Sequence, residues 1–87
     1  MELLERIKYI TGSDFISDLA QNCRITFYQF YKIKEINIDD YSLKEWNEAA
    51  QYISNENKKF DNSQDARDYI CTVLCLRRVV YVTRITK

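Results

Sequence analysis

Apolar residues return along this chain at the three- and four-residue spacing of amphipathic helices. Between positions 2 and 10 they form one helical face, which predicts a first helix, and Gly12 suits the turn that ends it. A second, shorter stripe covers positions 15–20, and Ser13 is its expected N-cap. The two stripes consist of Leu3, Leu4, Ile7 and Ile10, and of Phe15, Ile16, Leu19 and Ala20.

The segment 26–36 is rich in aromatic and β-branched residues, which would also suit a strand. Strict alternation fails there, because Tyr28 would share a strand face with Lys32 and Lys34. A helix gives a cleaner apolar face, which consists of Phe27, Phe30 and Ile33 or Ile36. We therefore predict a third helix over residues 26–36.

A fourth helix is predicted by its start signal. Ser42 and Glu45 match the capping box, in which the serine hydroxyl accepts from one backbone amide and the glutamate reaches back to another. The apolar face that follows consists of Leu43, Trp46, Ala50 and Ile53. We expect Trp46 to be buried against the helices that precede it.

A fifth segment begins where Asp61 or Ser63 can cap a helix, and its apolar face consists of Ala66, Tyr69, Ile70, Val73 and Leu74. After Arg78 the residues become β-branched, so the pattern predicts either a short terminal strand or a strained continuation of the helix. The chain of 87 residues suits one small domain over residues 1–87. We predict an all-α fold, a compact helix-turn-helix bundle of about five helical segments.

Composition argues against several classes of function. The chain contains no histidine and a single glycine, so it offers no imidazole base and no glycine-rich phosphate loop. We expect no enzyme activity and no cofactor. No apolar run is long enough to span a bilayer and no leader pattern opens the chain, which predicts a soluble, cytoplasmic protein without membrane contact.

Neither the acids nor the cysteines predict a metal site. One acidic set lies beside the fifth helix start, where the helix dipole favours acids in any case: Asp61, Asp65 and Asp68. Cys71 and Cys75 lie one helical turn apart but lack further ligands. Together with Cys23 they are too few for a disulfide framework, so we expect buried free thiols in a reducing compartment.

The net charge is zero but unevenly distributed along the chain. Residues 39–68 are mainly acidic, whereas residues 69–87 contain no acid and carry Arg77, Arg78, Arg84 and Lys87. A basic tail attracts phosphates, while the neutral total weakens non-specific affinity for DNA. Alternatively, the tail is simply solvated, or it balances the acidic segment across a dimer.

Residues 15–36 have the spacing of a helix-turn-helix. Ala20 is small where the second helix must cross closely, Ile25 fills the turn, and Phe30 and Ile33 lie on the buried side of the next helix. With the helix start at Ser42, this order resembles the Cro and phage-repressor type of helix-turn-helix, the XRE family, over residues 3–54. The matching positions are Leu19, Ala20, Ile25, Thr26, Phe30, Ile33, Ser42, Leu43 and Ala50.

The resemblance implies a DNA-binding transcriptional regulator of phage or mobile-element type that acts as a homodimer on double-stranded DNA. Its third helix would enter the major groove, with contacts from Thr26, Phe27, Tyr28, Gln29 and Lys32. Gln29 would bond adenine through both ends of its amide, and Arg77 and Arg78 would contact phosphates.

A rival interpretation is a small interaction protein. The aromatic residues of the third helix would equally suit a core or a protein-binding surface: Phe27, Tyr28, Phe30 and Tyr31. These residues and the neutral charge favour a phage or mobile-element inhibitor, for example an anti-CRISPR-like protein, that binds a host protein. The spacing of residues 15–36 favours the regulator, and a shared fold would not decide between the two.

Overall fold

The computed structural model is an assembly of helices. It describes the backbone of residues 2–21 and 25–86 and the side chains as far as residue 76. The elements are α1 (Glu2–Thr11), α2 (Ser17–Gln21), α3 (Phe27–Lys34), the 3-10 helix η1 (Ile38–Asp40), α4 (Leu43–Ser54) and α5 (Ser63–Thr86). The predicted all-α class is confirmed, and the described residues contain no strand.

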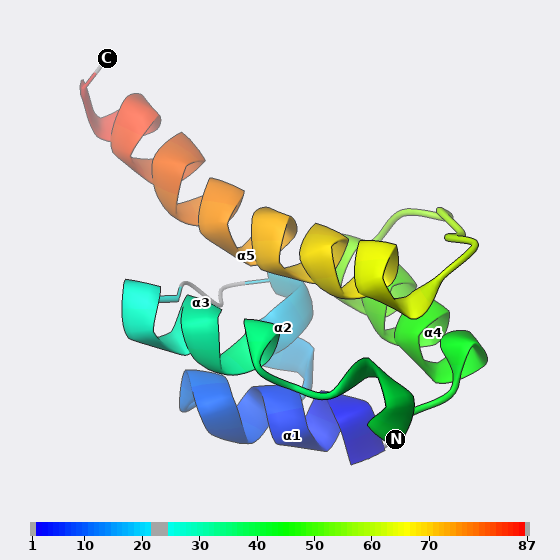
Figure 1. Cartoon of the computed structure of the whole chain (residues 1–87). Helices are drawn as coiled ribbons and strands as arrows, with labels where there is room; N and C mark the ends of the chain where they lie inside the picture. Colours follow the sequence, from blue (N-terminus) through cyan, green and yellow to red (C-terminus); the bar gives the residue numbers. More distant parts are fainter. Residues whose placement is uncertain (1, 22–24, 87) are drawn as a thin grey trace.

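The helices surround a single apolar core (Figure 1). α4 packs along the first half of α5, α3 lies between α1 and α5, and α2 packs against α4. All five α-helices contribute buried side chains, and Trp46 is fully buried as predicted. Phe27 and Leu43 were both expected on apolar faces, but they are exposed.

Two of the helix ends follow the sequence signals closely. Gly12 has φ +71° after the last residue of α1, and the amides of Gly12 and Ser13 donate back to the carbonyls of Tyr9 and Lys8. At α4 the Ser42 hydroxyl accepts from the Glu45 amide at 3.1 Å. The Glu45 carboxylate does not reach back to Ser42, however, and instead accepts from the Leu3 amide at 3.0 Å. The expected capping box is therefore half formed, and its acid joins α4 to the start of α1.

Two other helix starts differ from the prediction. Ser13 does not cap α2, which begins only at Ser17 and leaves Phe15 exposed in the connection before it. α5 is capped by Asn62, whose side-chain oxygen accepts from the Asp65 amide at 2.8 Å, and not by Asp61 or Ser63. Of the two alternatives predicted after Arg78, the helix is confirmed and the strand is not, because the backbone of residues 79–86 continues α5.

Replacing Ser42 with alanine should lower the free energy of unfolding by about 1 kcal/mol, because the Glu45 amide then loses its side-chain acceptor. Urea denaturation measures this loss as a lower midpoint at constant slope. The matched control is Ser63→Ala, which removes a hydroxyl from the first turn of α5, where Asn62 is the cap. Equal midpoints for the two variants would contradict the cap at Ser42.

Two free cysteines lie near the middle of α5. Burial raises the pKa of the Cys71 thiol to about 11, which keeps it protonated and unreactive at neutral pH. Cys75 is partly exposed, and Cys23 lies outside the described residues. Searched over the described part of the chain, the helices include none that is both long enough and apolar enough to cross a membrane.

Candidate functional site

The main candidate for a functional surface is the outer side of α3. Three aromatic side chains within two turns of this helix are largely in solvent: Phe27 is 75% exposed, Tyr28 69% and Tyr31 63%. We call these three residues the α3 aromatic face. Ile33 on the opposite side of the helix is fully buried, and Phe30 packs partly against the core. Only the inner side of α3 is therefore used by the fold.

The first turn of α3 is fixed by a complete capping box. The Thr26 hydroxyl accepts from the Gln29 amide at 3.2 Å, and the Gln29 side-chain oxygen accepts from the Thr26 amide at 2.9 Å. The other end of the Gln29 amide donates to the Thr11 carbonyl at 3.3 Å, which links α3 to the end of α1. Both ends of the Gln29 side chain are thus occupied within the fold, so reading a base would require these bonds to break.

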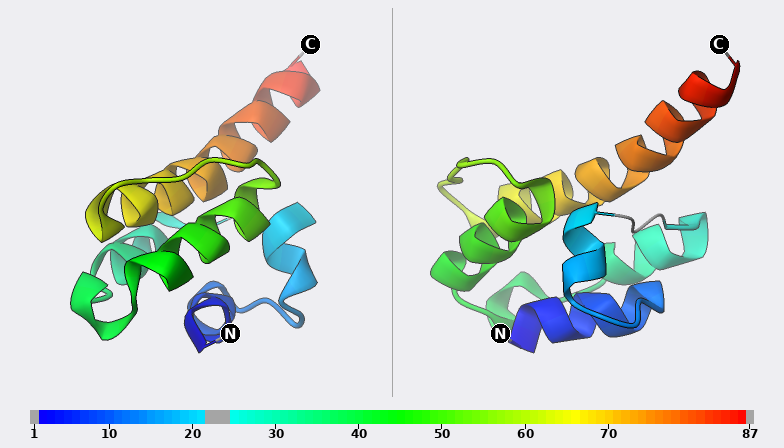
Figure 2. Two further views of the ribbon diagram at one scale, coloured as in Figure 1. Left: turned by 90° about the vertical axis from the view of Figure 1, so that its right-hand side faces the viewer. Right: turned by 180° about the vertical axis from the view of Figure 1, so that it is seen from behind.

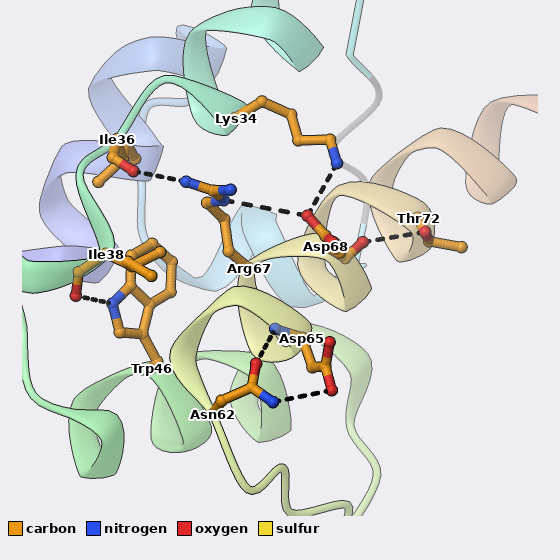
Figure 3. A network of polar contacts seen from close by, with 9 residues as sticks. All are labelled: Lys34, Ile36, Ile38, Trp46, Asn62, Asp65, Arg67, Asp68 and Thr72. Atoms are coloured by element: carbon orange, nitrogen blue, oxygen red, sulfur yellow. Dashed lines mark hydrogen bonds and ion pairs between the residues drawn. The ribbon is translucent and has the colours of Figure 1, made fainter.

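The last turn of α3 is fixed to α5 by a polar network (Figure 3). Lys34 Nζ lies 2.8 Å from Asp68 Oδ1, and Arg67 Nη1 donates to the Ile36 carbonyl at 3.0 Å. Arg67 Nε has no hydrogen-bond partner and lies 3.9 Å from the same Asp68 oxygen. With the capping box at its other end, α3 is anchored at both termini and holds its aromatic face in a fixed orientation.

The charged side chains beside the aromatic face neutralise each other. Lys32 Nζ lies 3.8 Å from Glu35 Oε1 and 5.4 Å from the centre of the Tyr28 ring. All three side chains are exposed, so the contacts are weak in water. The α3 surface therefore presents aromatic rings with one paired charge of each sign, instead of the excess of bases that a phosphate backbone attracts.

The predicted DNA contacts fall into three groups. Thr26 and Gln29 form the cap of α3, whereas Phe27, Tyr28 and Lys32 are exposed on it. The side chains of Arg77 and Arg78 lie outside the described residues.

The structural role of Gln29 was not predicted, although the pattern Thr26-x-x-Gln29 is the same capping signal that identified Ser42. The Lys34–Asp68 contact, which joins residues 34 positions apart, was not predicted either. No local pattern signals a pair at that separation.

The described residues do not gather the side chains of a metal centre. They contain no group of three or more metal-ligating side chains, and the chain as a whole has no histidine. The acids at the start of α5 serve the fold: Asp65 bonds Asn62 and Asp68 bonds Lys34. The α3 aromatic face can contact a partner through its aromatic rings and its tyrosine hydroxyls.

Comparison with family models, curated proteins and solved structures found no match to this chain in any of the three.

Proposed function

We propose that this chain is a small, non-enzymatic protein-binding domain that docks on a protein of its host cell through the α3 aromatic face. The observation that carries this proposal is the exposure of Phe27, Tyr28 and Tyr31 on a helix anchored at both ends. An inhibitor of the kind that phages and mobile elements encode would use such a surface to block a host protein by occupying it.

Residue type and rigidity both support a protein partner. Tyrosine and phenylalanine are enriched at protein interfaces and supply a large contact area for two rotatable bonds each. Because α3 is held by its cap and by Lys34, little further ordering is needed on binding. Lys32 and Glu35 beside the α3 aromatic face form an ion pair with each other. A partner can therefore cover the aromatic rings without burying an unpaired charge.

A second candidate is the DNA-binding regulator. It is supported by α3 itself, which follows α2 across a short connection, lies across the direction of α2 (Figure 2) and presents its outer side to solvent. Two observations argue against DNA binding. The side-chain amide of Gln29 already donates to the Thr11 carbonyl, and the chain has no net positive charge. In this candidate Lys32, Arg77 and Arg78 would supply phosphate contacts.

The test is site-specific photo-cross-linking in the host cell. A photoreactive phenylalanine analogue at position 31 should form one covalent adduct with a host protein, because position 31 lies within the α3 aromatic face. The matched control carries the same analogue in place of Tyr52, an exposed aromatic residue on α4, and should not form this adduct.

Adding Tyr28→Ser to the probe chain should abolish the adduct while circular dichroism shows an unchanged fold. An identical adduct from position 52, or cross-links from position 31 to DNA alone, would contradict protein binding through α3.

A further inference from the structure

The second half of α5 projects from the molecule. At about 1.5 Å per residue, its 24 residues account for most of the longest dimension of the chain, 41 Å, while the other two dimensions are 24 and 21 Å. Buried positions on α5 occur in its first half, and the last of them among the described side chains is Leu74. Figures 1 and 2 show the backbone beyond this point leaving the bundle.

The composition of the projecting part does not suit a helix that stands alone in water. Six of the ten residues 77–86 are β-branched, namely Val79, Val80, Val82, Thr83, Ile85 and Thr86. β-branched side chains lose rotamer freedom in a helix, and helices in proteins gain most of their stability from the packing of an apolar face. A packing partner would therefore stabilise the projecting part of α5.

The surface that a dimer would cover can be compared with the whole surface of the chain, which is 5850 Å². A stable interface covers roughly 800 Å² on each partner, which is about a seventh of the surface of this chain.

We propose that the partner is a second copy of this chain and that the two α5 helices pair in antiparallel orientation. Residues 77–87 carry four bases and no acid, whereas Asp61 and Asp65 are exposed at the start of α5 and form no ion pair within the described residues. A parallel pair would bring the two basic ends together. An antiparallel pair sets the basic end of each helix beside the acidic start of the other and also opposes their dipoles favourably.

The midpoint of α5 fixes the register of this pair. The helix spans Ser63–Thr86, so residue 65 of one copy lies level with residue 84 of the other when the helices pair about their midpoint. Leu76, which is 52% exposed, then lies next to the two-fold axis, as does the exposed Thr72 one turn away. The dimer gives this exposed leucine a buried place.

Sedimentation equilibrium on the full chain tests the dimer. The wild type should approach twice the 10.5 kDa chain mass as concentration rises, and Leu76→Glu should remain at the monomer mass with unchanged circular dichroism. The control Tyr9→Glu adds the same charge at a residue of α1 that is 86% exposed, and it should dimerise like the wild type. A wild type that stays monomeric at every concentration, or a Leu76→Glu variant that dimerises normally, would overturn the proposal.

Charge reversal tests the orientation. Asp65→Arg and Arg84→Asp should each raise the dimer dissociation constant severalfold, and the double variant should restore it, because positions 65 and 84 meet only in the antiparallel pair. A double variant no better than the singles would overturn the antiparallel arrangement. Because Asp65 is exposed, these variants also decide the matter if Leu76→Glu proves unfolded.

Discussion

Replacing Trp46 with alanine is expected to destabilise the protein by about 3–5 kcal/mol, the range measured when large aromatic residues are removed from cores. The Trp46 side chain is fully buried, its indole Nε1 donates to the Ile38 carbonyl at 3.0 Å, and the Tyr41 ring meets it edge-on with centroids 6.1 Å apart. A loss of this size approaches the entire stability of a small domain. The variant should therefore be largely unfolded at 37 °C.

Thermal and urea denaturation followed by circular dichroism measure this effect. The matched control is Trp46→Phe, which retains most of the ring packing but loses the bond to Ile38, and it should cost roughly 1–3 kcal/mol. Native-like unfolding of Trp46→Ala would contradict the central position of this residue. Equal losses in the two variants would show that the hydrogen bond, and not the packing, dominates.

Replacing Arg67 with alanine is expected to cost about 1–3 kcal/mol, since the Ile36 carbonyl in the α3–η1 connection loses its donor. The Arg67 side chain is only 17% exposed, so water is a poor substitute for it as the donor to the Ile36 carbonyl. Arg67→Lys should recover only part of the loss, because an ammonium cannot reproduce the two-sided contact of the guanidinium with Ile36 and Asp68.

Hydrogen exchange gives this prediction a local readout. In Arg67→Ala the backbone amides at the end of α3 should exchange faster, while those of α4 change only by the global loss of stability. The control is Lys34→Ala, which removes a partly exposed ion pair and should cost less than 1 kcal/mol. A larger loss for Lys34→Ala than for Arg67→Ala would contradict the role assigned to Arg67.

The parts of the fold that the sequence predicts are those set by local chemistry. Gly12 and Ser42 act as expected because their signals, a left-handed turn and a hydroxyl cap, depend on a few neighbouring residues. Trp46 is buried because its helix has a clear apolar face. The start of α5 was misplaced by one residue, since Asn62 competes with Asp61 and Ser63 in a run of good caps.

Long-range contacts explain what the sequence could not predict. The Arg67–Ile36 bond joins residues 31 positions apart, and the Gln29–Thr11 bond joins residues 18 apart, so neither follows from a local pattern. Residues 79–86 were ambiguous for a different reason. Their β-branched composition suits a strand, but they continue a helix that is already nucleated at Asn62, and extending a helix costs far less than starting one.

The most direct test of protein binding through α3 is isothermal titration calorimetry. The host protein that photo-cross-linking identifies is purified without the cross-link and titrated into the purified chain. We predict that Tyr28→Ser with Tyr31→Ser raises Kd by about 30-fold or more, as expected when interface hot spots worth about 2 kcal/mol are lost. Tyr52→Ser should bind like the wild type. An unchanged Kd for the α3 double variant, or saturable and salt-sensitive binding of DNA that the same variant abolishes, would contradict protein binding through α3.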